Sequence, residues 1–476
     1  MGVDDQLVRS AVIGDEESER SPNRMSGWRV LRPLVLRLHF YAGVFVAPFL
    51  VVAAVTGLMY VYTPQIDALL YEHELHVRDS PVSRSLTDQV AVATAARPGD
   101  TVTLVRPAPT GTDTTQVVFE APDLSASYTR TAFVDPHTAE LRGVLETYGS
   151  GGALPVRAWV DNLHRGLHLG DAGRLYSELA ASWLWVVALG GVALWLSQRR
   201  KKNRLRSLLL PERGATGRRR LVSRHGSAGL WISAGLLFLS ATGLTWSTFA
   251  GENITSLRSA LSWDTPAVST ELGGAEGPSG AGAPGADIGF DGALASARSY
   301  GLAGSVEITP PETADQAYTV KQNGRQLPSR QDALAVDPGS GEVVDAQRFA
   351  DYPFVAKLAR WGIDAHMGVL FGLPNQLLLT ALMLGFLWVV YCGYRLWWTR
   401  RPRQDGERRG GAPPRRGSWR RVPGRVLAPL ILGAVFVAYF LPLLGASLLA
   451  FLCVDGILGT RARRRALNEE VEGAAS

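Results

Sequence analysis

The sequence predicts an α-helical membrane bundle, with four core spans plus a C-terminal hairpin or span, and two small α+β domains outside the membrane. Three observations predict this fold class. Apolar blocks of spanning length alternate with long polar segments, basic residues cluster on alternate connections, and short motifs recur in the same order in both halves of the chain. The average hydropathy hides the first pattern, because the polar segments offset the apolar ones.

Four blocks are long and apolar enough to cross a bilayer as helices, which takes about 20 residues. They are Leu38–Tyr62, Leu179–Ser197, Leu230–Phe249 and Gln376–Trp398. A fifth apolar stretch, Val426–Leu458, has arginines at both ends and Pro442 in its middle. Basic residues at both ends predict a helical hairpin with both ends inside, and the alternative is a single span.

Basic residues cluster on the connections that are expected to stay inside. Arg199–Arg224 carries eleven Lys or Arg against one acid, and Arg400–Arg425 carries ten Arg against two acids. Thr63–Val160 has seven basic and twelve acidic residues, and Thr248–Gly362 has eight and fourteen. Positive charges beside spans stay in the cytoplasm, so the two acidic connections face outward. Because the basic runs directly follow apolar helices, they indicate topology and not a nucleic-acid partner.

The charged N-terminal 36 residues do not resemble a secretory signal, so we expect a cytoplasmic tail. The predicted segments are: cytoplasmic tail 1–36, first span 37–62, first outer domain 63–160, interfacial helix and second span 161–198, basic linker 199–224, third span 225–249, second outer domain 250–352, interfacial helix and fourth span 353–399, basic linker 400–425, C-terminal hairpin or span 426–458, and cytoplasmic tail 459–476. Both cysteines, Cys392 and Cys453, lie in apolar runs and are expected to be inert thiols.

Ordered repeats predict that the chain contains two copies of one plan, helix, outer domain, helix. The repeated motifs are His39-x-x-x-Gly43 with Thr56-Gly57 and His225-x-x-x-Gly229 with Thr242-Gly243; Val134-Asp135-Pro136 and Val336-Asp337-Pro338; His164-x-Gly166 and His366-x-Gly368; and Leu184–Val187 and Leu387–Val390. The spacing from His to Thr-Gly is identical in both copies.

The sequence of the outer domains predicts an α+β fold. A helical stretch near Thr87–Ala96 precedes β-rich runs at Thr101–Val105 and Gln116–Glu120, and Asp-Pro pairs at Asp135 and Asp337 suit hairpin turns. A Gly/Ala/Pro-rich insert, Gly273–Gly289, is expected to be a flexible loop.

Five of the eight histidines fall near the ends of the spans. His39 and His225 open the first and third spans at the inner side, whereas His164, His168 and His366 precede the second and fourth spans at the outer side. The duplication therefore predicts one inner pair and one outer pair. At 100° per residue, Gly43 and Gly57 share a stripe with His39, as Gly229 and Gly243 do with His225. Such glycines let a flat macrocycle approach the backbone, or let helices pack closely.

Ionisable residues in a membrane indicate a functional site. Neutral imidazole suits haem iron, copper or zinc, and few carboxylates or thiols accompany these histidines. Two haems b, each held by two axial imidazoles, fit best, with pairs His39/His225 and His164/His366 as ligands. No CxxCH occurs, which excludes covalent attachment. His168 is replaced by Leu370 in the second copy, so it ranks below His164, as a spare ligand or a propionate partner.

The chain resembles the PepSY-associated transmembrane family, often called iron-regulated membrane proteins. The resemblance covers about Arg37 to Pro402 and is carried by LHFYAGVFVAPFLVVAAVTGLMY, NLHRGLHLGDAGRL, RHGSAGLWISAGLLFLSATGLTW and AHMGVLFGLPNQ. It implies a four-helix bundle with PepSY-like outer domains, located in the bacterial cytoplasmic membrane. Some members are haem-b proteins that reduce ferric siderophores at the outer face. The histidine positions of the family correspond to His39, His164, His225 and His366.

The leading hypothesis is thus a haem-dependent ferric-siderophore or ferric-chelate reductase that aids iron uptake. No GxGxxG opens a helix after a strand, so a quinol or a separate cytoplasmic reductase would supply the electrons. A second hypothesis is a permease for a metal or chelate, although the spans lack internal carboxylates. A third is a non-enzymatic sensing or protease-regulating protein, which predicts that no cofactor binds.

Overall fold

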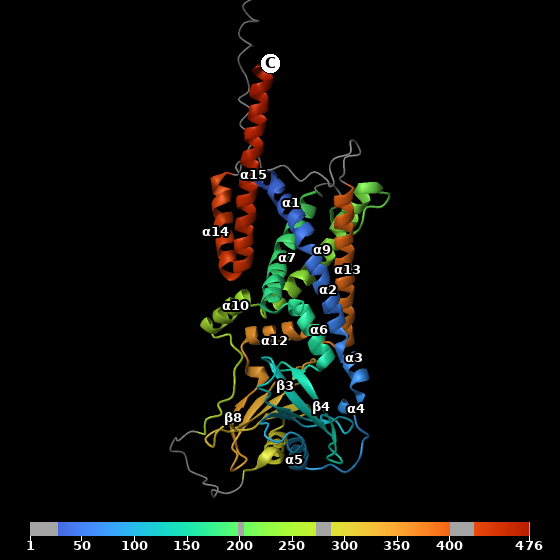
Figure 1. The fold of residues 1–476 in the computed structure, drawn as a ribbon, viewed down its shortest axis with the longest axis vertical. Coiled ribbons are helices and arrows are strands. Elements are labelled where there is room, and N and C mark those ends of the chain that lie inside the picture. Colours follow the sequence, from blue (N-terminus) through green and yellow to red (C-terminus); the bar gives the residue numbers. More distant parts are fainter. Residues whose placement is uncertain (1–26, 199–203, 273–286, 400–422, 476) are drawn as a thin grey trace, which may run out of the picture.

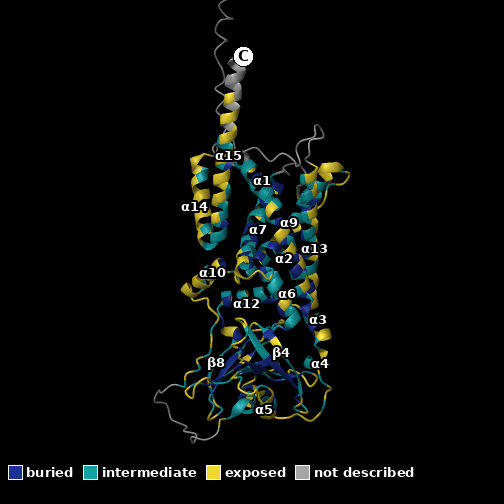
Figure 2. Ribbon diagram, viewed as in Figure 1, coloured by how far each residue is buried: buried dark blue, intermediate teal, exposed yellow. Residues whose placement is uncertain are grey.

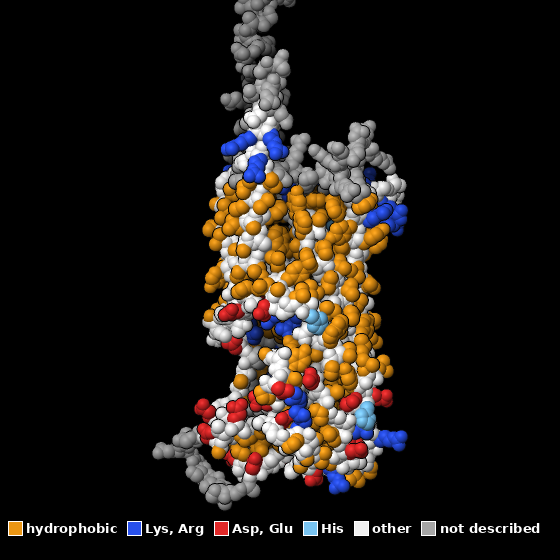
Figure 3. Space-filling model, in the orientation of Figure 1, with side chains coloured by type: hydrophobic (Ala, Val, Ile, Leu, Met, Phe, Trp, Pro, Cys, Tyr) orange, Lys and Arg blue, Asp and Glu red, His pale blue; other side chains and the backbone are white. Residues whose placement is uncertain are grey.

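The computed structural model describes residues 27–198, 204–272, 287–399 and 423–475, and separates a helical bundle from a β-sheet (Figure 1). Apolar side chains cover the bundle on the face that Figure 3 shows. Lys and Arg side chains lie beyond them at the end where the C-terminus emerges, and most of the acidic side chains in this view lie toward the sheet (Figure 3). The long acidic connections thus lie together at one end, as the charge pattern predicts.

Three long apolar helices form the centre of the bundle: α7 (Gly170–Gln198), α9 (Gly217–Leu244) and α13 (Leu373–Trp398). The first span is not the single straight helix that we expected. It consists of α1 (Gly27–Phe45) and α2 (Ala47–Val61), which meet at a 56° bend. Pro48 lies in the first turn of α2, where its missing N–H costs no helical hydrogen bond, so a new helix starts there readily.

The C-terminal apolar stretch, Val426–Leu458, forms a helical hairpin and not a single span. Helices α14 (Gly424–Phe440) and α15 (Pro442–Ala475) pack side by side, and α15 begins at Pro442 (Figure 1). Helix α15 also packs on α7, where Trp183 Nε1 donates to Ser447 Oγ at 2.9 Å. Of the described helices, four are long and apolar enough to cross a membrane, and the bent pair makes a fifth.

The two outer domains are not separate, contrary to our expectation. Their strands form one eight-stranded antiparallel sheet in the order β4-β3-β2-β1-β5-β6-β7-β8. The strands are β1 (Val102–Arg106), β2 (Thr115–Phe119), β3 (Tyr128–Val134), β4 (Leu141–Tyr148), β5 (Val306–Thr309), β6 (Tyr318–Gln322), β7 (Ala333–Val336) and β8 (Val343–Gln347). Strands β1 and β5 would otherwise be edges with unpaired backbone groups, and pairing them satisfies these groups.

The join between the halves is reinforced on both sides of the sheet. Arg106 Nε donates to Glu307 Oε1 at 2.9 Å across β1 and β5. Helices α5 (Leu86–Ala96) and α11 (Gly289–Ser299) contact each other on the face away from the bundle. There Asp291 accepts hydrogen bonds from the backbone N–H groups of Leu86 and Thr87, which caps α5 from the other half.

The pairing register is the same in both halves when it is followed outward from β1 and β5. Val105 pairs with Ile308 at the join. From there the successive partners are Val105–Val117–Ala132–Val144 in one half and Ile308–Val320–Leu334–Ala346 in the other. The outermost hairpins turn at Asp135 and Asp337, as predicted, and each Asp Oδ1 accepts a backbone N–H two residues on at 2.7 Å.

Short helices connect the sheet to the bundle. Helices α6 (Pro155–Gly166) and α12 (Phe354–His366) lie between the two, so their residues face both (Figure 1). The remaining elements are α3 (Thr63–Leu70), α4 (Glu72–Leu75), α8 (Arg204–Leu209), α10 (Phe249–Ala260) and the 3₁₀ turn η1 (Phe349–Asp351). Helix α10 was assigned to the second outer domain but packs on α14 and α15 instead. The predicted flexible insert lies mostly outside the described residues. Buried residues concentrate in the sheet and the bundle interior (Figure 2).

Candidate paired-histidine site

His39 of α1 and His225 of α9, the inner pair, lie next to each other in the bundle. Their Nδ1 atoms lie 2.9 Å from the carbonyl oxygen of Val187 and 3.0 Å from that of Val389. A carbonyl oxygen only accepts, so each Nδ1 carries the proton and each Nε2 keeps a free lone pair. Metal-binding histidines are commonly oriented in this way.

The spacing of the inner pair suits one metal atom between the rings. The ring centroids are 6.0 Å apart and the ring planes are 79° to each other. A metal–imidazole bond is about 2 Å long, so two imidazoles on opposite sides of one metal place their centroids about 6 Å apart. The spacing of the inner pair therefore leaves room for one metal atom between the two imidazoles.

Two glycines that the sequence analysis did not select lie against the inner pair. A Cβ on Gly191 would stand 2.9 Å from His39 Cε1, and one on Gly393 would stand 3.5 Å from His225 Cε1. Gly191 and Val187 correspond to Gly393 and Val389, with the spacing of His164 to His366. The match of Leu184–Val187 with Leu387–Val390 was thus one residue out of register, and the correct register would have shown these glycines.

His164 of α6 and His366 of α12, the outer pair, are oriented by threonines. Thr56 Oγ1 lies 3.0 Å from His164 Nδ1, and Thr242 Oγ1 lies 2.6 Å from His366 Nδ1. Each hydroxyl is also 2.8 Å from a backbone carbonyl of its own helix, that of Val52 or Phe238. Since the single hydroxyl proton goes to that carbonyl, the oxygen accepts from the imidazole and Nε2 is again free.

The Thr-Gly motif thus has two functions at the outer pair. Beside each threonine, a glycine leaves room for the ring: a Cβ on Gly57 would stand 3.0 Å from His164 Cε1, and one on Gly243 3.6 Å from His366 Cε1. Burial, with a smaller contribution from His164, lowers the pKa of His366 to about 3. His366 is therefore neutral at physiological pH, which is the form that binds metals.

A cavity of about 600 Å³ includes both histidines of the outer pair. Its deep wall is apolar and comes from the bundle, with Leu50, Leu236 and Phe386 among its residues. Toward the sheet it becomes polar, with lining residues from α6, α12, β5, β6 and the 323–331 loop. A cavity with apolar walls and a few polar groups is typical of a cofactor or small-molecule site.

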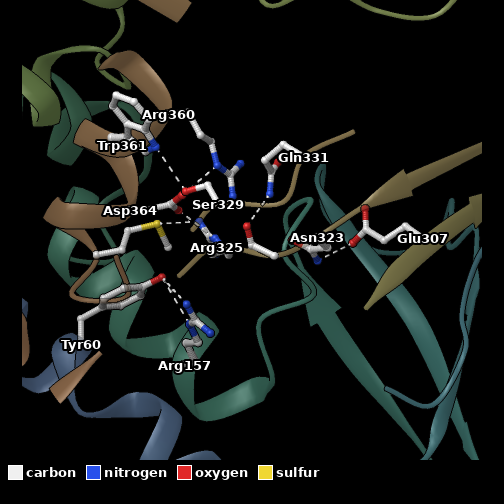
Figure 4. Close-up of polar contacts among 12 residues, drawn as sticks. Tyr60, Arg157, Glu307, Asn323, Arg325, Ser329, Gln331, Arg360, Trp361 and Asp364 are labelled. Atoms are coloured by element: carbon white, nitrogen blue, oxygen red, sulfur yellow. Dashed lines mark hydrogen bonds and ion pairs between the residues drawn. The ribbon is translucent and has the colours of Figure 1, made fainter. Parts of the chain in front are cut away.

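The polar wall is built on ion pairs and hydrogen bonds from α6, α12 and the 323–331 loop (Figure 4). Asp364, whose side chain is fully buried, accepts from Arg325 Nε at 2.9 Å and from Arg360 Nε at 2.8 Å. Arg157 donates to the hydroxyl of Tyr60 at 3.1 Å. The Arg325–Asp364 contact holds α12, which carries His366, against the outer domain, and the Arg157–Tyr60 contact joins α6 to α2.

The other predicted site residues lie elsewhere. His168 is exposed and packs on Trp159, with 5.1 Å between ring centroids, and it does not line the cavity. Its placement in the site was wrong, because the chain turns through positive φ at Leu167 and His168 and directs it away from the bundle. A Cβ on Gly43 or Gly229 would meet open space, so close helix packing does not explain these two glycines.

In the part of the chain that the structure describes, no group of three or more His, Cys, Asp or Glu side chains could hold a metal ion. The fold and the site define a multi-pass membrane protein with paired histidines at two depths of a helical bundle. The chain belongs to the PepSY-associated transmembrane family, whose model, described as the PepSY-associated TM region, matches residues 36–400. The comparison with curated proteins gave no match.

Proposed function

We propose that this protein is a haem-b oxidoreductase that passes electrons across a bacterial cytoplasmic membrane and reduces ferric siderophores or chelates at the outer face. The observation that carries the proposal is the state of the four histidines. Each has Nδ1 in a hydrogen bond with an oxygen acceptor and Nε2 free, and they occur as two pairs at two depths. Haem b, when bound by these pairs, supplies one-electron carriers on both sides of the membrane.

The residues between the two pairs support this proposal. A cluster of apolar side chains lies there, and all but Ile232 also form the deep wall of the cavity at the outer pair: Leu50, Ala54, Ala180, Leu184, Ile232, Leu236, Met383 and Phe386. This apolar wall offers no polar group to an ion or a charged chelate, so electrons would cross between the outer and the inner pair more readily than ions. The bundle is thereby suited to electron transfer and less suited to carrying a chelate.

The cavity at the outer pair would hold the substrate. It extends from His164 and His366 to the sheet, so a ferric chelate held there would lie next to the outer pair. We further propose that the two four-stranded halves of the sheet are PepSY-like units that arose by duplication, supported by their equal pairing register. A membrane quinol or a cytoplasmic reductase would supply the electrons at the inner pair.

The test is a visible spectrum of the protein purified in mild detergent, before and after dithionite, with a pyridine haemochrome count. We expect low-spin bands and about two haems per chain, since each pair of imidazoles binds one iron. Ferric chelates should then reoxidise the reduced protein. Absence of a Soret band after expression with ample haem would overturn the proposal and favour the permease or sensing alternatives.

Gly191→Ala should disturb the inner pair much more than Gly393→Ala. The added methyl group would stand 2.9 Å from His39 Cε1 in the first case and 3.5 Å from His225 Cε1, an ordinary contact, in the second. We expect broadened or high-spin bands from one haem in Gly191→Ala only, measured by electron paramagnetic resonance of the oxidised protein. Equal spectra for the two variants would contradict the role of Gly191.

The proposed sidedness predicts the labelling of single cysteines. In a variant with Cys392 and Cys453 replaced by Ala, Ser125→Cys in the outer domain should react with a membrane-impermeant maleimide on intact spheroplasts. Arg213→Cys, in the basic linker, should react only after lysis, because basic connections stay in the cytoplasm. Both positions are exposed, so burial does not protect either. The reverse pattern would show that the sheet faces the cytoplasm.

A further inference from the structure

The cavity lining carries a net positive charge, because it has more cations than carboxylates: Arg157, Arg165, Arg174, Lys321, Arg325 and Arg360 against Asp161, Glu178 and Glu307. Glu178 accepts from the backbone N–H groups of Phe249 and Ala250 at 3.0 and 2.9 Å. Glu307 accepts from Arg106 at 2.9 Å and from Asn323 at 2.8 Å. Asp161 lies 3.5 Å from Arg165. Two of the three carboxylates are thus paired with arginines, and the third is held by backbone N–H groups.

Three cations of the lining have no such partner. Within the described ranges, no carboxylate lies within 4.0 Å of Arg157, Arg174 or Lys321. Arg157 donates only to the hydroxyl of Tyr60, and Arg174 only to the carbonyl oxygen of Trp246 at 3.5 Å. Burial raises the pKa of the Asp67 carboxyl to about 6, although the positive charge of Arg157 lowers it in part.

Two further cations share one acid. Arg325 and Arg360 both bind Asp364, so their two positive charges face a single negative charge (Figure 4). Together with the three unpaired cations, they give the polar wall an excess of positive charge. Positive charge in a partly enclosed site is costly without a counter-ion, and a concave wall of one sign concentrates ligands of the other sign.

We infer that the cavity selects anionic ferric chelates, meaning complexes with carboxylate or catecholate groups whose net charge is negative. This inference deepens the proposed function and rests on it for the identity of the ligand as a ferric chelate. Guanidinium groups bind carboxylate and similar oxygens with two parallel hydrogen bonds, so Arg157 and Arg174 provide geometry as well as charge. Lys321, exposed on β6, provides a point charge at the sheet side of the site.

A propionate of a haem at the outer pair is the competing partner for these cations. It has the same carboxylate chemistry, and Arg157 lies in the same cavity as His164. The two partners differ in what is lost when the cation is removed. Loss of a propionate partner reduces haem retention, whereas loss of a chelate partner reduces chelate affinity at constant haem content.

The experiment measures binding of redox-inert gallium chelates to the full-length protein in nanodiscs by isothermal titration calorimetry at low ionic strength. Gallium citrate is the anionic probe, and gallium desferrioxamine B, which is cationic, is the matched control. We expect the anionic complex to bind and the cationic one to bind at least about tenfold more weakly. Raising the salt concentration should weaken only the anionic binding.

Single substitutions then test which cations bind the anionic chelate. Arg157→Gln and Lys321→Gln should each weaken binding of gallium citrate about tenfold. Arg142→Gln, which changes a half-buried arginine of the outer domain that does not line the cavity, should leave the affinity for gallium citrate unchanged. Each preparation is also assayed for haem. Equal affinity for the two complexes, or no binding of either, would overturn the inference.

The haem assay separates this inference from the proposed function. Gallium is not reduced, so charge selectivity is measurable whether or not the protein transfers electrons. Loss of haem from Arg157→Gln with unchanged binding of gallium citrate would show that Arg157 binds the cofactor, and would overturn its proposed role in binding the chelate. Selective binding by a haem-free protein would support the charge inference while refuting the reductase.

Discussion

Replacement of His366 by alanine should lower the haem content from about two to about one per chain, because one axial imidazole does not retain haem b as two do. His39→Ala should remove the other haem, and the double variant should remove both. The pyridine haemochrome count of the purified variants measures this directly. His168→Ala is the matched control, since its ring packs on Trp159 outside the cavity and its loss should leave two haems.

Two results would contradict this assignment. An unchanged count in both His39→Ala and His366→Ala would show that the pairs do not hold the cofactor. Loss of both haems in either single variant would show that the sites are not independent, or that the fold has failed. Circular dichroism of the same preparations distinguishes the last case, because a misfolded bundle loses helix content.

Asp364→Asn should lower the stability of the protein by about 3 kcal/mol, since removing the buried charge leaves two guanidinium groups without an ion-pair partner. The side chain of Asp364 is fully buried and bonds to Arg325 and Arg360. The measurement is the midpoint of denaturant unfolding in detergent, followed by tryptophan fluorescence, because Trp361 lies on the same helix. We expect the transition to shift to lower denaturant.

The control for this prediction is another acid that pairs with an arginine of the outer domain. Asp123, an exposed residue of the turn before β3, pairs with Arg130 of β3. Solvent screens this interaction. Asp123→Asn should therefore leave the midpoint unchanged within error. Equal shifts for the two variants would mean that the Asp364 cluster does not hold α12 to the outer domain.

Local sequence patterns were sufficient for the spans and for the histidine pairs. The length of an apolar run predicts a spanning helix. The repeated spacing predicted the two histidine pairs. In the structure, His39 and His225 lie next to each other in the bundle, and His164 and His366 line one cavity. The partners of these rings were not predictable in the same way. Two are backbone carbonyls, which are present at every residue, so no side-chain signal marks Val187 or Val389.

Other features depend on tertiary contacts. The sequence predicts strands in each half but contains no signal that β1 pairs with β5, because this pairing joins residues about two hundred positions apart. The bend at Val46 was not predicted, because the apolar run continues through it; Pro48, which favours the start of a new helix, is the only local signal for it. His168 was misplaced because periodicity says nothing about the positive φ that ends α6.

The pairing of Val105 with Ile308 has a consequence for symmetry. These two residues hold equivalent places in their halves, and in an antiparallel ladder a residue can face its own equivalent only on a two-fold rotation axis. The same meeting of the two halves that sets β1 against β5 sets His39 next to His225 and brings His164 and His366 into one cavity. A chain of half this length would have an unpaired central strand and half of each site. It could complete both only as an isologous homodimer.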